Sequence, residues 1–327
     1  MDLDPRIKLV IGRGSFKHVY CLELDHDRRL LFVVDGLSSC IMVYSPDDGE
    51  FRFKIGGRGK RRGRFHYPSK VCIDEKRARM IVCDTYNHRL QVLTLDGTFV
   101  MEFGKEGQQF GEFYYPSAVA IDRKRDQLIV CDGNNDRVLV LSAIDCSFVS
   151  QLCDRTLVSF PQDVAFDHRL DRIIVCDTSN ARVLVWSAVD HTLLFSIDGL
   201  RVPRGVCVDN LSRIIVSELI DPKLLAYTHE GHLISTFDVQ GSMAERGPVA
   251  FDEHRGHIAF ATEDAVYVIG ANQWLPGTYA WHSDRHCHAP KPIKQAVMTM
   301  TMIRSLIEHA PLSLLPNELL FEIFAYL

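Results

Sequence analysis

The chain has 327 residues, of which 46% are hydrophobic and 24% charged, and its net charge is −5. This balance is that of a folded soluble protein and excludes global disorder, while the acidic net charge excludes a surface that binds nucleic acid indiscriminately. No apolar run reaches the roughly eighteen residues that a membrane span needs. The first residues do not resemble a signal peptide, so we expect a cytoplasmic protein with no membrane partner.

From residue 31 onward the chain repeats one unit of sequence. Prolines that precede the same pattern recur at intervals of 42 to 48 residues, and an earlier unit lacks the proline. Within a unit, three runs rich in β-branched residues and a fourth run after a tight turn predict four short strands. Four strands in a period of about 45 residues form the blade of a β-propeller, and no helical period is present. The marker prolines are Pro68, Pro116, Pro161, Pro203 and Pro248.

The predicted fold is an all-β, six-bladed propeller over residues 6–282, and such a ring has to be closed because an open last blade would expose a strand edge. The segment Ile7–Ile11, followed by glycines at 12 and 14, is predicted to be the fourth strand of the blade that starts at Pro248. Closure by the segment Tyr279–Trp281 is the alternative.

Cysteines recur in register rather than in complementary pairs. Cys83, Cys131 and Cys176 all stand in the sequence IVCD, and Cys72 and Cys207 share a second position of the unit. A residue that repeats in one position of successive blades is typical of a small buried hydrophobic residue, whereas disulfides need partners. We therefore expect reduced cysteines in the core.

The residues DTYNHRLQVL at 84–93 resemble the signature of the NHL repeat. The resemblance extends over about residues 7–269 and implies an NHL propeller similar to those of TRIM-NHL proteins. Within this signature, Asp84, Asn87 and Arg89 form the pattern D-x-x-N-x-R. Asp and Asn side chains hydrogen-bond to their own backbone in turns, and a nearby Arg can pair with the carboxylate, so we expect the three residues to stabilise a turn. The pattern D-x-x-N-x-R recurs at Asp132, Asn135 and Arg137, and at Asp177, Asn180 and Arg182.

Connections between antiparallel strands alternate between two faces of a blade, which places the D-x-x-N-x-R turns and the loop GGRGKRRGRFHYP on the same face. Cations beside aromatic rings can neutralise phosphates and stack bases, as single-stranded RNA requires, and similar TRIM-NHL domains bind RNA in this way. We nevertheless expect this face to bind a protein partner, with RNA binding and a solvated loop over a structural turn as the alternatives, and DNA is not expected. The candidate residues are Arg58, Lys60, Arg61, Arg62, Arg64, His66, Tyr67, Tyr86, His88, Arg89 and Tyr115, with Tyr114 beside them.

Some six-bladed propellers hydrolyse lactones or phosphoesters, and one NHL relative is a peptide-amidating lyase, at sites in the central channel. The inner-strand mouth here offers one carboxylate, Asp163, and no histidine, which is too few ligands for a hard cation. We therefore predict no catalytic residue, no metal and no cofactor, with a metal-dependent hydrolase or lyase as an alternative. The channel positions considered are Ser69, Ser117, Gln162 and Arg204, then Lys70, Ala118, Asp163 and Gly205.

A polar linker is predicted at residues 283–292, where Pro290 and Pro292 break regular structure. Histidine and cysteine are zinc ligands, but their spacing here matches no structural zinc pattern, so we expect them to belong to the linker. The residues concerned are His282, His286, Cys287 and His288.

A helical tail is predicted at residues 293–327, beginning with an amphipathic helix between Ile293 and Ile307. The segment LSLLPNELLFEIFAYL at 312–327 resembles the first helix of an F-box, which implies binding to a Skp-type adaptor and a cullin of the ubiquitin machinery. The predicted function is thus a non-catalytic protein-interaction scaffold that recruits a substrate to a ligase, while a SOCS-like box and a helix hairpin packed on the propeller are alternatives. The matching residues are Leu315, Pro316, Glu318, Leu319, Leu320, Ile323, Phe324, Tyr326 and Leu327.

Overall fold

The computed structural model describes residues 4, 6–239, 243–244, 247–263 and 265–275. The chain divides into two compact units, residues 1–276 and 277–327, and the second unit lies outside the described residues. The linker, the histidine and cysteine run, the predicted tail helix and the F-box-like segment all fall in this part.

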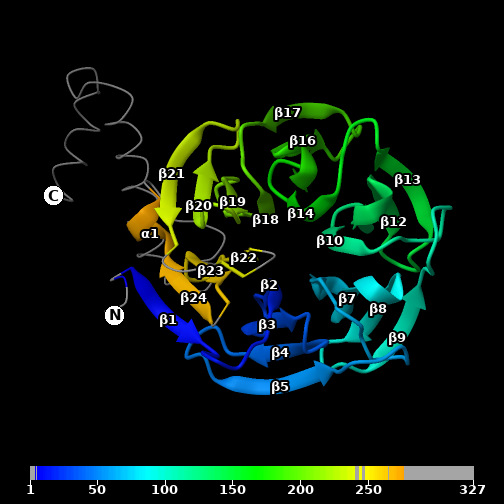
Figure 1. The fold of residues 1–327 in the computed structure, drawn as a ribbon, viewed down its shortest axis with the longest axis horizontal. Helices are drawn as coiled ribbons and strands as arrows, with labels where there is room; N and C mark the ends of the chain where they lie inside the picture. The colour runs from blue at the N-terminus through cyan, green and yellow to red at the C-terminus, as the bar shows by residue number, and fades with distance from the viewer. Residues whose placement is uncertain (1–3, 5, 240–242, 245–246, 264, 276–327) are drawn as a thin grey trace, which may run out of the picture. The chain divides into compact units, whose positions relative to one another are not determined.

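The first unit is a ring of six antiparallel four-stranded sheets, which confirms the predicted propeller (Figure 1). In each blade the first strand lies beside the central channel and the last strand lies at the rim (Figure 1). The first three blades consist of β2 (Val19–Asp25), β3 (Leu30–Asp35), β4 (Cys40–Tyr44) and β5 (Phe51–Gly56); β6 (Lys70–Asp74), β7 (Arg79–Asp84), β8 (Arg89–Thr94) and β9 (Phe99–Phe103); and β10 (Pro116–Asp122), β11 (Gln127–Asp132), β12 (Arg137–Ser142) and β13 (Phe148–Cys153).

The fourth and fifth blades repeat this order, and the sixth takes its outer strand from the beginning of the chain. They consist of β14 (Pro161–Asp167), β15 (Arg172–Asp177), β16 (Arg182–Ser187) and β17 (Leu193–Ile197); β18 (Pro203–Val208), β19 (Ile214–Glu218), β20 (Lys223–Tyr227) and β21 (Leu233–Asp238); and β22 (Val249–Asp252), β23 (His257–Ala261), β24 (Val266–Gly270) and β1 (Ile7–Ile11). A short helix, α1 (Ala271–Trp274), follows β24.

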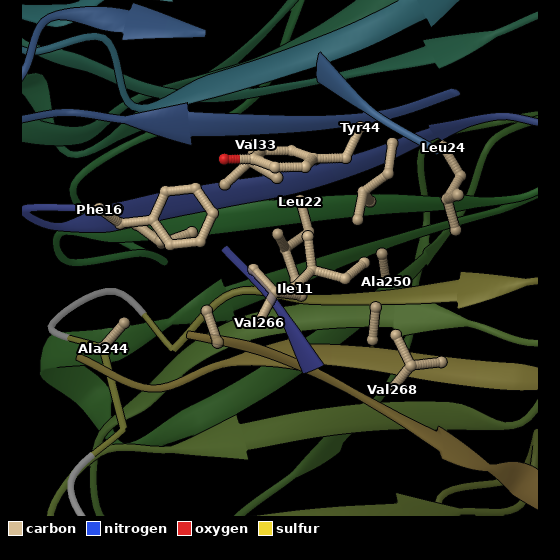
Figure 2. Close-up of a cluster of buried hydrophobic side chains, with 14 residues drawn as sticks. Ile11, Phe16, Leu22, Leu24, Val33, Tyr44, Ala244, Ala250, Val266 and Val268 are labelled. Carbon is tan, nitrogen blue, oxygen red and sulfur yellow. The ribbon is translucent and has the colours of Figure 1, made fainter. Parts of the chain in front are cut away.

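Strand β1 closes the ring as predicted, because it pairs with β24 and places Ile11 opposite Val266. The alternative, closure by residues 279–281, is therefore wrong, since β1 occupies the place beside β24. Figure 2 shows the apolar cluster at this junction, where Ile11 and Val266 lie with Leu22 of the first blade's inner strand. The first and last blades thus share one core.

The recurring Asp of each D-x-x-N-x-R turn is a buried hydrogen-bond acceptor. Asp84 accepts from the side chains of Asn87, Arg89 and Gln91, and from the backbone N–H of His66 in the preceding loop. The predicted pairing of Asp84 with Arg89 is confirmed, whereas the carboxylate accepts from the backbone of the preceding loop and not from the backbone of its own turn. The same Asp–Arg pair is present at 2.8 Å between Asp132 and Arg137 and between Asp177 and Arg182.

Hydroxyl groups join successive blades around the channel. The hydroxyl of Thr85 donates to the carbonyl of Pro116 in the next blade, at 2.9 Å. Each such bond satisfies a carbonyl at the start of an inner strand, where no fifth strand is available to pair with it. Thr178, in the position of Thr85, donates to Pro203, and hydroxyls at other positions make similar bonds from Ser117 to Pro161 and from Ser217 to Gly247, just before β22.

The nine cysteines of the described part are free thiols, and eight of them are buried. Burial raises the pKa of Cys21 and of Cys153 to about 12 in each case, so both thiols stay protonated at neutral pH. The cysteines act as small hydrophobic core residues, as their recurrence in register indicated.

Candidate functional site

A loop rich in cations connects the first blade to the second on the face that carries the D-x-x-N-x-R turns, here called the upper face. This basic loop comprises residues 57–66 and contains five cations. Its backbone folds back on itself, because the N–H of Gly59 donates to the carbonyl of Phe65 at 2.8 Å and the N–H of Phe65 donates to Gly57 at 3.0 Å. The Phe65 side chain is fully buried beneath the loop. The cations therefore stand on a fixed frame.

Side chains of the second blade form hydrogen bonds with the backbone of the basic loop. The side-chain amide of Gln91 donates to the carbonyl of Arg64 at 2.7 Å, and its oxygen accepts from the N–H of Gly63 at 2.9 Å. The Arg89 guanidinium donates to Asp84 and to the carbonyls of Arg61 and Arg64. Because only 11% of the Arg89 side chain is exposed, it supports the loop rather than standing free on its surface, contrary to its place among the candidate binding residues.

The five cations of the loop are exposed, but they differ in their partners. Arg62 forms an ion pair with Glu102 at 3.5 Å and lies over the ring of Phe99, and Arg64 donates to the carbonyl of Gly56. Within the described residues, no acidic side chain pairs with the other three. The cations available to a partner are therefore Arg58, Lys60 and Arg61.

Six aromatic residues form a continuous cluster beside the basic loop, and the predicted residues are thus brought together. The ring centroids of Tyr67 and Tyr86 are 4.7 Å apart, and those of Tyr86 and Tyr115 are 5.0 Å apart. The rings mostly meet edge to face, the arrangement that aromatic quadrupoles favour. Tyr86 is the most open of them, with 44% of its surface exposed. The cluster comprises His66, Tyr67, Tyr86, His88, Tyr114 and Tyr115.

His88 belongs to the interior of this cluster and is only 9% exposed. Its Nδ1 accepts a hydrogen bond from the backbone N–H of Tyr115 at 3.2 Å, and its ring stacks on Tyr114. Burial lowers the pKa of His88, which keeps the acceptor unprotonated at neutral pH. His88 is thus a support of the aromatic cluster and not the exposed contact residue that was expected.

An ion pair in the central channel joins two blades. The Lys70 ammonium lies 2.7 Å from the Asp163 carboxylate of a blade across the ring, and both side chains are nearly buried. Asp163 also accepts from the N–H of Val206 at 2.9 Å, which ties a third blade to the pair. This ion pair lies at the channel positions considered in the sequence analysis and uses the one carboxylate found there.

A cavity of about 150 Å³ adjoins this ion pair, since Lys70 is one of its lining residues, and it extends to the ends of the inner strands opposite the upper face. Glu23 lines it, and burial raises the pKa of this carboxyl to about 7. Reasoning from the sequence missed the residues of this end, because it considered only the upper mouth of the channel. Within the described residues, no group of three or more His, Cys, Asp or Glu side chains could hold a metal ion. The lower lining residues are His26, Arg123, His168 and Glu253.

Comparison with known proteins supports the architecture. Residues 65–162 match a family model described as a 6-bladed beta-propeller, and residues 159–186 match the NHL repeat. No curated protein matches the chain. Among solved structures, a chain from a crystal structure of a nidogen/laminin complex superposes with a TM-score of 0.61 at 15% identity, covering 79% of this chain and 87% of that one. At this identity the likeness concerns the fold alone. No helix in the described part of the chain is long and apolar enough to cross a membrane.

Proposed function

We propose that this chain is a non-catalytic scaffold that binds a protein partner through the upper face of the propeller. The observation that carries the proposal is the basic loop, in which Arg58, Lys60 and Arg61 are exposed while the backbone beneath them is fixed by hydrogen bonds. A preorganised surface loses little conformational entropy on binding, so its contacts contribute more fully to affinity. The adjacent aromatic cluster supplies the ring-rich contact area that is typical of interface hot spots.

The second part of the proposal concerns residues 312–327, which lie outside the described residues. Their resemblance to the first F-box helix supports a role in which the tail binds a Skp-type adaptor and a cullin, so that the propeller presents its partner for ubiquitination. The reduced core cysteines agree with the cytoplasm as the place of action, since thiols stay reduced there.

Single-stranded RNA is the alternative partner for the same upper face, because cations and aromatic rings lie side by side there. A channel enzyme is the other alternative. The Lys70–Asp163 ion pair lies in the channel, and each member of the pair already compensates the other's charge. The upper face therefore binds the partner in this proposal, and the channel residues have a structural role.

Affinity purification from cell lysate, followed by mass spectrometry, tests both parts. The full chain is compared with a chain ending at Pro311 and with the triple variant R58A/K60A/R61A. A matched control, K8A/R52A/R169A, removes three exposed cations from other parts of the propeller. We expect the triple variant to lose its partner proteins while the matched control retains them. We expect the shortened chain to keep these partners and to lose the adaptor and the cullin.

Two results would contradict the proposal separately. Partners that remain bound to the triple variant would remove the upper face from the mechanism. Equal recovery of adaptor and cullin with both chain lengths, or recovery with neither, would remove the F-box-like segment. RNA recovered in place of proteins, and lost in the triple variant, would favour the alternative.

A further inference from the structure

The basic loop has a structural twin in the next blade. Residues 105–113 belong to the connection from β9 to β10, and a bridge between Glu106 and Phe113 corresponds to the bridge between Arg58 and Phe65. A glycine with positive φ precedes each loop, and a Cβ on Gly56 or on Gly104 would lie within 2.4 Å of the buried phenylalanine ring. The two loops therefore share one backbone design.

Arginine supports both loops in the same way. Arg137 pairs with Asp132 and donates to the carbonyls of Gln108, Gln109 and Glu112, as Arg89 does from Asp84 to the basic loop. The side chains displayed above this common frame are nevertheless different. Arg58, Lys60 and Arg61 of the basic loop correspond to Glu106, Gln108 and Gln109 of its twin.

The twin folds without any of these three cations, so the backbone design does not require them. Gathering like charges on one short loop raises its electrostatic energy unless an opposite charge compensates. Within the described residues, no carboxylate pairs with Arg58, Lys60 or Arg61, while Arg62 next to them already has Glu102. The positive charge is therefore free to attract an anionic partner.

The aromatic cluster indicates which kind of anion fits. Successive RNA bases stack on aromatic rings whose faces are separate and open. In this cluster the rings pack against one another, with centroids 4.4 to 5.5 Å apart. Only Tyr86 presents much of its surface. Such a cluster offers one compact apolar anchor point beside the cations, which suits a folded or extended polypeptide better than a run of bases.

We infer that the basic loop and Tyr86 bind an acidic segment of a partner protein, rich in aspartate or glutamate and containing an apolar anchor residue. Carboxylates of the segment pair with Arg58, Lys60 and Arg61, and the anchor packs on the exposed part of Tyr86. Charge-assisted hydrogen bonds from arginine to carboxylate give this contact direction as well as strength. The inference rests on the proposed function, because it names the class of protein that the upper face takes.

The test uses the full chain as bait for a phage-displayed library of random 12-residue peptides. The variant R58E/K60Q/R61Q, which carries the residues of the twin loop at these positions, serves as the second bait. We expect wild-type protein to enrich peptides with clustered Asp and Glu and at least one aromatic or aliphatic residue. The loop variant loses this enrichment while its thermal unfolding remains that of a folded propeller.

Fluorescence anisotropy then measures the affinity of one enriched peptide, its copy with alanine at the anchor residue, and a 12-nucleotide poly(U) RNA. We expect the loop variant to bind the enriched peptide at least tenfold more weakly, and Y86A to lose the preference for the anchor residue. We also expect affinity for the peptide to fall with increasing salt.

Several outcomes would overturn the inference. Enriched peptides without an excess of acidic residues, or acidic peptides bound equally by the loop variant, would remove the acidic class. Tighter binding of poly(U) than of any selected peptide would assign the surface to nucleic acid. If the lysate partners depend on the upper face but the peptides are not acidic, the scaffold function stands and only this inference fails.

Discussion

The imidazole Nδ1 of His88 accepts the backbone N–H of Tyr115 at 3.2 Å, and this bond joins a turn of the second blade to the start of the third. The same place in two other blades holds a different acceptor, whereas Ala181 of the fourth blade has positive φ and no side-chain acceptor. Positive φ is therefore the feature that these turns share, and the side-chain acceptor is an addition that some of the blades make. The equivalent pairs are Ser39 with Tyr67 and Asp136 with Phe160.

Replacing His88 by alanine leaves the N–H of Tyr115 without its partner in a partly buried site. We expect H88A to lower the free energy of unfolding by about 1–3 kcal/mol, the usual cost of an unsatisfied polar group together with lost packing. H88N keeps an acceptor and tolerates positive φ, so it loses less. Urea unfolding of the three proteins measures the difference. Equal stability of H88A and H88N would show that the hydrogen bond is unimportant.

The lowered pKa of His88 makes the contribution of this residue to the free energy of unfolding depend on pH. The unfolded state binds a proton near the ordinary histidine pKa of about 6.5, whereas the folded state resists protonation to lower pH. The stabilisation by neutral His88 is therefore complete above about pH 6.5 and is lost as pH falls through the lower folded pKa. We expect the stability difference between wild type and H88N to shrink from pH 7.5 to pH 5. A difference that grows toward acid would contradict this assignment.

Breaking the ion pair in the channel has a large expected cost. K70M leaves the carboxylate of Asp163 nearly buried and unpaired, which we expect to cost about 3–5 kcal/mol. The double variant K70M/D163N removes the stranded charge but keeps an acceptor for the N–H of Val206, and we expect it to recover most of the loss. Denaturant titrations followed by circular dichroism provide the comparison. A double variant no more stable than K70M would mean that the charge itself does not decide the cost.

Glu23 opposes folding when it is ionised. Burial raises its pKa from 4.5 to about 7, so the folded state binds a proton that the unfolded state has released between these pH values. The wild-type protein therefore becomes less stable as pH rises through this window, while E23Q does not. We expect E23Q to be more stable than wild type by roughly 1–3 kcal/mol at pH 8, given about 1.4 kcal/mol for each pKa unit. The advantage should vanish near pH 4.5, and an advantage independent of pH would indicate a packing effect instead.

Ring closure depends on the apolar contacts of β1. Ile11 is fully buried in the core shared by the first and last blades. We expect I11A to lower the free energy of unfolding by about 2–5 kcal/mol, the range for truncating a buried aliphatic side chain. K8A, at an exposed position of the same strand, is the control and should change stability little. Hydrogen exchange should show faster opening of β1 and β24 in I11A, and unchanged exchange in these strands would argue against this role.

Much of the propeller could be predicted because the repeat places equivalent residues in equivalent positions. The apolar run Met80–Cys83 became the middle of β7, and the strand extends to Arg79 and Asp84 because these polar ends also pair in the ladder. The closing strand was recognisable because Ile7–Ile11 and the glycines after it resemble the end of a blade. Such local patterns carry the information for register and order.

The candidate site was predicted less completely. The D-x-x-N-x-R spacing shows that Arg89 lies near Asp84, but not that its guanidinium reaches carbonyls some 25 residues earlier in the basic loop. His88 is indistinguishable in the sequence from an exposed turn residue. The position of Glu23 in the channel cavity was not predicted, because this residue occurs in one blade only and the prediction relied on residues that recur between blades. Contacts between separate segments and features of a single blade are what a repeat pattern cannot convey.

Among the strands of the propeller, β1 leaves the ribosome first and pairs with the strand that is made last. Its neighbour β24 follows only after the five intervening blades have been made, since Ile11 pairs with Val266. At a synthesis rate of about 5–20 residues per second, β1 waits on the order of tens of seconds with its hydrogen-bonding edges unpaired. During that interval the nascent chain offers an open strand at each end, a condition that invites pairing with a neighbouring nascent chain on the same message. The same pairing that completes the last blade thus has a consequence for biosynthesis. Until β1 and β24 pair with each other, both must be kept from pairing with strands of other chains.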